Sequence, residues 1–342
     1  MLNPVNSPLE IPALHELEMV SPWFDASAPR TPTATPRPQP AEPETRQLLV
    51  VLSIPRCGSY HLCRLLWQLG YGKPAEYFNP SLQPLLARFH PEAKHRYQRV
   101  LYRTKQRLQP HHPTPQWLEG LVQERTSTST ITGQPWFAAK LQPDQLGSLP
   151  QALNRVFEPL ARKGYWKPFH IKPPALVMLY RRDWTAMVLS HHLARCSGSF
   201  DQRRIFTHQH RSITQLGAEQ ALLEDLSCAK RHLEALTHTL ETSLYPIHLT
   251  DFESLLSQQT HMLATLISRI DPYSPPPADL GNSPKLQFKI ARTPDPWASD
   301  LATWQQHLHS RFQELNLHKH PDSLACQALI TQLDSYLPSE GS

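Results

Sequence analysis

The chain has 342 residues, 39% of them apolar, and can therefore bury a substantial core in one large domain or two modest ones. Its 35 prolines and 11 glycines exclude collagen-like and glycine-rich repeats. Lys and Arg exceed Asp and Glu by five, 34 against 29, so the charge does not indicate a nucleic-acid surface. Binding of a single phosphate-sized ligand stays open.

We expect neither a membrane span nor a leader in the N-terminal part of the given sequence. The apolar run at 48–52 is far shorter than the roughly 20 residues that cross a bilayer. A charged region followed by an apolar stretch is absent at the start of the chain. The five cysteines are odd in number and widely scattered. We therefore expect a cytoplasmic protein in a reducing environment.

Residues 26–46 contain six prolines and no large apolar side chain. Such a segment cannot bury enough surface to offset its ordering entropy. Residues 9–24 have apolar side chains at near-helical spacing, and this segment is either a docking segment or a fraying tail. We expect a disordered, Pro-rich N-terminal extension over 1–46 and one folded domain over 47–336.

Three apolar runs, at 48–52, 175–180 and 245–250, are predicted as buried strands. Each precedes a predicted amphipathic helix, and Asp251 is placed to cap the helix that follows the third run. Further helices are predicted over 222–240 and 301–315. This alternation indicates an α/β fold with a central, mostly parallel sheet flanked by helices.

The loop after the first strand has the composition of an anion site. Backbone N–H groups and the positive end of a helix dipole converge where a strand leads into a helix. Gly58 permits close backbone approach, Arg56 adds a permanent cation and Ser59 a hydroxyl. The loop lacks the second glycine and the lysine of a Walker A motif, so ATP or GTP hydrolysis is disfavoured.

The second strand is followed by a similar set of residues. Arg182 stands at the strand end, Asp183 is a candidate helix cap, and Ser190 lies two helical turns further on. Arg182 and Ser190 could together hold a second phosphate. Two such sites at neighbouring strand ends favour a ligand with phosphate groups at separate corners, bound at the carboxyl edge of the sheet.

The residues so far described carry a family resemblance. Ile54-Pro55-Arg56-Cys57-Gly58-Ser59 through Leu62-Cys63, and then Pro74 to Pro80, resemble the PRSGSTLLC and PxEFFxP patterns of the bacterial trehalose 2-sulfotransferase-like family. Phe137 to Leu141 with Asp144 to Leu146, and Leu179 to Asp183 with Ser190, are similar to two further family segments. The resemblance runs from about residue 48 to 253, and more faintly to 312.

The resemblance implies a P-loop-like sulfotransferase fold and 3′-phosphoadenosine 5′-phosphosulfate (PAPS) as co-substrate. Arg56, Gly58 and Ser59 would line the 5′-phosphosulfate loop, with backbone N–H groups of Cys57, Tyr60 and His61. Arg182 and Ser190 would hold the 3′-phosphate, with Arg181 assisting or facing solvent. Glu76 matches the base that deprotonates the acceptor hydroxyl. Tyr60 and His61 replace the family's Thr and Leu, which puts one hydroxyl ligand, and the rate, in question.

We expect the acceptor to be a carbohydrate or glycolipid, and residues 89–130 and 196–211 to form the walls of its binding site. We expect no nucleic-acid partner. A homodimer stays open. We expect no metal, because the histidine pairs lack the Cys and acidic partners of a zinc site.

Several residue roles are left open. His61, His191 and His192 could contact the substrates, and Arg292 the nucleotide. Cys57, beside Arg56 and a helix N-terminus, is expected to have a lowered pKa and could be reactive, or it simply replaces the family's serine. The alternative functions are a non-catalytic PAP-binding protein and, third, a kinase or NTPase.

Overall fold

The computed structural model describes residues 47–77, 121–122, 125–131, 133–142, 174–197, 218–243, 245–271 and 298–337. Five strands form one sheet: β1 Gln47–Ser53, β2 Ser127–Thr128, β3 Pro135–Leu141, β4 Ala175–Tyr180 and β5 Ile247–Asp251. The helices are α2 Ser59–Gln68, α9 Trp184–Ser197, α11 Glu219–Thr242, α12 Phe252–Ser257, α13 Gln259–Ile270, α14 Ala298–Glu314 and α15 Pro321–Ser335, with a short 3₁₀ helix at Leu317–Lys319.

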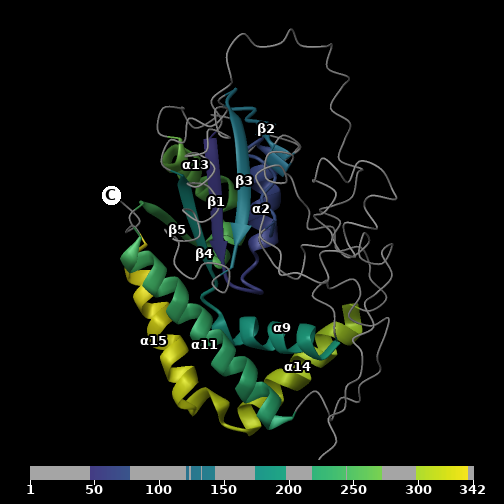
Figure 1. Ribbon diagram of the computed structural model, residues 1–342. Helices are drawn as coiled ribbons and strands as arrows, with labels where there is room; N and C mark the ends of the chain where they lie inside the picture. The colour runs from purple at the N-terminus through teal and green to yellow at the C-terminus, as the bar shows by residue number, and fades with distance from the viewer. Residues whose placement is uncertain are drawn as a thin grey trace, which may run out of the picture. The chain divides into compact units, whose positions relative to one another are not determined.

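The sheet has the order β2-β3-β1-β4-β5, and β1 lies between β3 and β4 (Figure 1). Strands β3, β1, β4 and β5 are parallel, and β2 pairs antiparallel with β3 at the edge. All seven residues of β1 are buried, as expected for a central strand covered on both faces. The α/β fold with a mostly parallel sheet is confirmed.

The three predicted strands are present. β1 extends the predicted run 48–52 by one residue at each end, and β4 has the predicted bounds. β5 begins at Ile247, two residues later than predicted, and ends at Asp251. The Asp251 carboxylate accepts a hydrogen bond from the backbone N–H of Ser254, so the predicted cap of α12 is confirmed.

The predicted helix over 222–240 is α11, whose apolar stripe is buried, and the helical stripe over 301–315 largely coincides with α14. α15 packs along α11, and Figure 1 shows the two helices side by side. Ser227 of α11 donates to Asp322 of α15, and Trp184 of α9 donates to Gln327 of α15. These contacts bind the C-terminal helix to the helices that follow β4 and precede β5.

Several predictions fall outside the described residues. They are the extension over 1–46, most of the acceptor wall over 89–130, nearly all of the second wall over 196–211, and the role of Arg292. Within the described ranges, no helix has the length and apolarity needed to cross a bilayer.

Candidate active site

The loop between β1 and α2 has an unusual backbone. Arg56 has φ 65° and Gly58 has φ 82°, both in the left-handed region. A non-glycine residue there is uncommon and requires support from surrounding structure. A Cβ on Gly58 would lie 2.1 Å from the ring of Phe252, the first residue of α12. Glycine is therefore required by the conformation and by the close approach of α12.

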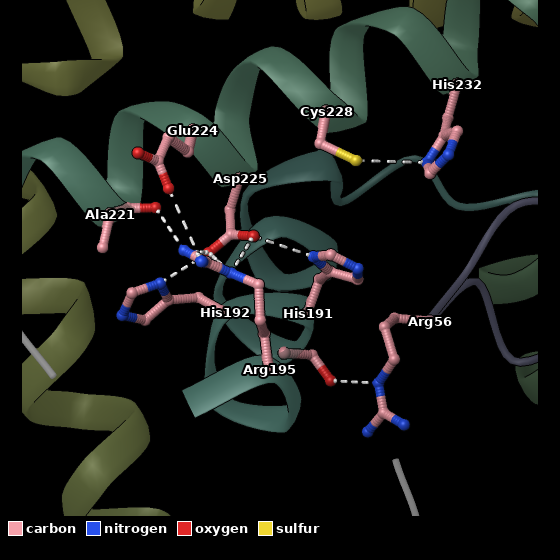
Figure 2. Close-up of polar contacts among 10 residues, drawn as sticks. Arg56, His191, His192, Arg195, Ala221, Glu224, Asp225, Cys228 and His232 are labelled. Atoms are coloured by element: carbon pink, nitrogen blue, oxygen red, sulfur yellow. Dashed lines mark hydrogen bonds and ion pairs between the residues drawn. The ribbon is translucent and has the colours of Figure 1, made fainter. Parts of the chain in front are cut away.

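The loop meets the helix that follows β4. β1 and β4 are neighbouring parallel strands, so the chain leaves both at the same edge of the sheet. Arg56 is directed toward α9 (Figure 2). Its Nε donates to Ser190 Oγ of α9 at 2.9 Å. The structure thus brings together one residue from each of the two predicted anion sites.

Arg182 has partners that the sequence did not reveal. Its side chain donates to Asp334 of α15 at 3.0 Å and lies 3.3 Å from Asp251 at the end of β5. Its backbone N–H donates to Glu253 at 3.0 Å. The Tyr180 hydroxyl also donates to Asp334. Arg182 therefore lies at the predicted edge of the sheet, but its guanidinium already contacts the carboxylates of Asp334 and Asp251.

The sequence allows Arg181 either to assist in binding the nucleotide or to face solvent. In the structure its side chain is directed toward α12. Its Nε lies 3.7 Å from a Glu253 oxygen, and its guanidinium lies 5.5 Å from the centre of the Phe252 ring. These contacts hold Arg181 against the start of α12.

Glu76, Lys140 and Tyr60 form a cluster in which Glu76 and Lys140 are buried and Tyr60 is exposed. Lys140 Nζ is 2.6 Å from Glu76 Oε1, and the two residues are 2% and 6% exposed. The Tyr60 hydroxyl donates to the same oxygen at 3.2 Å, and Lys140 Nζ lies 4.4 Å from the centre of the Tyr60 ring. The Lys140 backbone N–H donates to the Ala75 carbonyl, which holds the glutamate segment against β3. These contacts hold Glu76 in place beside a cationic partner, Lys140.

This environment shifts the pKa values of its members. Burial alone would lower the pKa of Lys140, but Tyr60 and Glu76 beside it outweigh burial and raise that pKa. Burial raises the pKa of Tyr60 to about 12, with Glu76 adding to the rise and Lys140 opposing it. Lys140 is thus a cation and Tyr60 a neutral hydrogen-bond donor at neutral pH.

One prediction about the loop is corrected, and one contact in the loop was not foreseen. Cys57 is buried, and this burial raises the pKa of its thiol by more than Lys140 and the hydrogen bonds with Ser59 lower it. The expected low pKa of Cys57 is therefore wrong, and a buried, protonated thiol is not activated as a nucleophile. The Tyr60 hydroxyl is directed to Glu76, a contact that the sequence comparison with the family's Thr did not indicate.

The three candidate histidines contact protein groups. His61 Nε2 lies 3.2 Å from Gln259 Oε1 of α13, and burial lowers the pKa of His61. His191 and His192 both bond the buried carboxylate of Asp225 on α11, at 3.1 and 2.6 Å (Figure 2). Arg195 adds a third contact to Asp225 at 2.9 Å. These contacts fix α9, and with it Ser190, against α11.

Comparison with known proteins decides the family. A family model described as Stf0 sulphotransferase matches residues 49–298. The chain belongs to the Stf0 sulphotransferase family. The matched region contains the Arg56 loop, Glu76, Lys140, Arg182 and Ser190, and it ends at the start of α14, before α15. A search of curated proteins finds no match.

Membership identifies the chain as a sulphotransferase, which moves a sulfuryl group from a donor to an acceptor. Within the described residues, no group of three His, Cys, Asp or Glu side chains is arranged to hold a metal ion. The site instead offers cations, hydroxyls and backbone N–H groups at one edge of the sheet, which are the groups that hold phosphate and sulfate.

Proposed function

We propose that this Stf0 sulphotransferase transfers the sulfuryl group of PAPS to a hydroxyl of a carbohydrate or glycolipid. The observation that carries the proposal is the hydrogen bond between Arg56 and Ser190, because it places the two predicted anion-binding segments side by side. The carbohydrate acceptor is inferred from the resemblance to trehalose 2-sulfotransferases.

The residues at this edge fit a bisphosphorylated nucleotide. The loop N–H groups from Cys57 to His61, Arg56 and Ser59 would bind the 5′-phosphosulfate. Ser190 and Arg182 would bind the 3′-phosphate. Arg182 already bonds carboxylates, which are planar anions with the same demand for paired N–H donors as a phosphate. A bound 3′-phosphate would take over part of that role.

The transfer is an in-line displacement at sulfur. The acceptor oxygen forms a bond to sulfur while the bond from sulfur to the oxygen bridging to the 5′-phosphate breaks, and negative charge grows on that bridging oxygen. Arg56 would stabilise this charge, and one such donor contributes about 3 kcal/mol. Glu76 would take the proton of the acceptor hydroxyl, a contribution of about 10²- to 10⁴-fold in rate.

A second candidate function follows from Tyr60, which replaces the family's smaller Thr in the proposed phosphosulfate loop. If this ring excludes the sulfuryl group, the chain is a non-catalytic protein that binds PAP or a related nucleotide. Saturable PAPS binding without transfer to a broad acceptor panel would select this alternative.

The test is transfer from PAPS with a labelled sulfuryl group. The purified protein is incubated with labelled PAPS and a cell extract, and the labelled product is identified. We expect Arg56→Ala to reduce transfer by at least about 100-fold, since it removes a transition-state donor. Arg311→Ala is the control, because Arg311 lies on α14 and bonds the exposed Glu314. Full activity of the Arg56 variant would contradict the proposal.

A further inference from the structure

We propose that Tyr60 is a positioning residue for Glu76: its phenol holds the carboxylate in the orientation that receives the acceptor proton. The inference rests on the proposed function, because it assigns Glu76 the role of base. It concerns a residue that departs from the family pattern, where a Thr follows Gly-Ser, and for which that pattern supplies no role.

The cluster is assembled from three separate segments. Tyr60 is the second residue of α2, Lys140 is on β3, and Glu76 lies in the segment between them. Lys140 and Tyr60 both bond Glu76 Oε1, at 2.6 and 3.2 Å. Two donors on one oxygen restrict the rotation of a carboxylate that has a broad range of terminal torsion angles. The orientation of Glu76 is therefore set by its neighbours.

The two donors have different environments. Lys140 is 2% exposed, whereas Tyr60 is 44% exposed, so the cluster reaches the protein surface at Tyr60. An acceptor that approaches Glu76 from solvent would therefore meet the tyrosine. Tyr60 also directly follows Ser59 in the proposed phosphosulfate loop, so it connects the donor loop to the base. A phenol at this position can align Glu76 relative to the sulfur.

Among the described residues, the titratable groups that act on Glu76 are Lys140 from β3 and Tyr60 and Cys63 from α2, and Cys57 from the loop acts on Lys140 and Cys63. Burial raises the pKa of Cys63 to about 12 and raises that of Cys57, so both thiols are neutral at neutral pH. Lys140 thus supplies charge and Tyr60 supplies a neutral donor. Removal of the phenol oxygen changes the hydrogen bonding of Glu76 and leaves the charge of the cluster unchanged.

The first experiment compares Tyr60→Phe with the unchanged protein in kcat, in its pH dependence and in PAP affinity. We expect kcat to fall about 10-fold, the value of one hydrogen bond to a charged group. The acidic limb of the pH profile should move to higher pH by about half a unit or more, because the carboxylate loses a donor. PAP affinity should stay within about twofold. Tyr336→Phe, which removes an exposed hydroxyl near Glu241, is the matched control.

Two outcomes of that experiment would overturn the proposal. Unchanged kcat and pH profile would show that the phenol does not act on the base. A loss of PAP affinity with an unchanged pH profile would indicate that the Tyr60 hydroxyl contacts the nucleotide and not the base.

A second measurement does not depend on transfer. Urea unfolding of Tyr60→Phe, Glu76→Gln and the double variant forms a cycle in which contacting residues give non-additive stability changes. We expect non-additivity, and additive changes would overturn the Tyr60–Glu76 coupling. If coupling is found but no acceptor is ever sulfated, the proposed function fails while the contact stands.

Discussion

Gly58 is the residue on which the loop between β1 and α2 most depends. It combines a left-handed backbone with a position directly beneath the Phe252 ring. Gly133 has a similar left-handed φ of 69°, but a Cβ there would meet nothing within 4 Å. A comparison of alanine substitutions at these two positions therefore separates the energetic cost of the left-handed backbone from the cost of a steric clash.

We predict that Gly58→Ala lowers the free energy of unfolding by about 2–5 kcal/mol, because conformational strain and overpacking add. Gly133→Ala should cost about 1 kcal/mol from strain alone. Urea unfolding of both variants measures the difference. Equal losses would show that Phe252 moves aside without cost, and that α12 does not constrain the loop.

At the scale of elements, α15 matters for the site although it lies beyond the region matched by the family model. Its Asp334 bonds Arg182, the residue proposed for the 3′-phosphate. A carboxylate close to a bound phosphate repels it. Asp322 on the same helix bonds Ser227 and Lys230 of α11, which are not part of the proposed site.

We predict that Asp334→Asn strengthens PAP binding by about 3- to 10-fold, because a nearby negative charge is removed at a partly exposed position. Asp322→Asn should leave PAP affinity within about twofold. Titration calorimetry with PAP measures both. Weaker binding by the Asp334 variant would mean that Asp334 orients Arg182 for the ligand.

For the whole molecule, buried titratable groups make stability depend on pH. Burial lowers the pKa of His61, and burial with the nearby Arg269 lowers that of His248. Both histidines gain protons on unfolding, so stability is lost as pH falls below their ordinary value of about 6.5. Burial alone would raise the pKa of Asp225, but hydrogen bonds from His191, His192 and Arg195 outweigh it and lower that pKa. The ionised Asp225 therefore stabilises the folded state above about pH 4, and this stabilisation is lost as the pH falls below that value.

We predict two losses of stability on acidification, one between about pH 7 and 5 and one below about pH 4. Asp225→Asn should cost about 3–5 kcal/mol at neutral pH and flatten the second loss. Glu224→Gln is the matched control, because Glu224 also pairs with Arg195 but is 55% exposed. Urea unfolding from pH 7.5 to 3 tests this. An undiminished second loss in the Asp225 variant would assign it to other carboxylates.

The sequence by itself determined the strand-loop-helix units. The apolar runs at 48–52 and 175–180 predict β1 and β4 because continuous burial on both faces needs uninterrupted apolar residues. Each unit depends on residues near one another in the chain. The contact of Arg56 with Ser190, 134 positions away, also requires that β1 and β4 be parallel neighbours in the sheet.

Only the tertiary structure decided which residues pair across long separations. β3 and its buried Lys140, 64 positions from Glu76, were not predicted as a strand, because a lysine interrupts the apolar run and its partner is distant. The pairing of Arg182 with Asp334, 152 positions away, gives no local signal either. Periodicity reports which face of an element is buried, whereas the partner of a buried charge depends on how elements from the whole chain pack together.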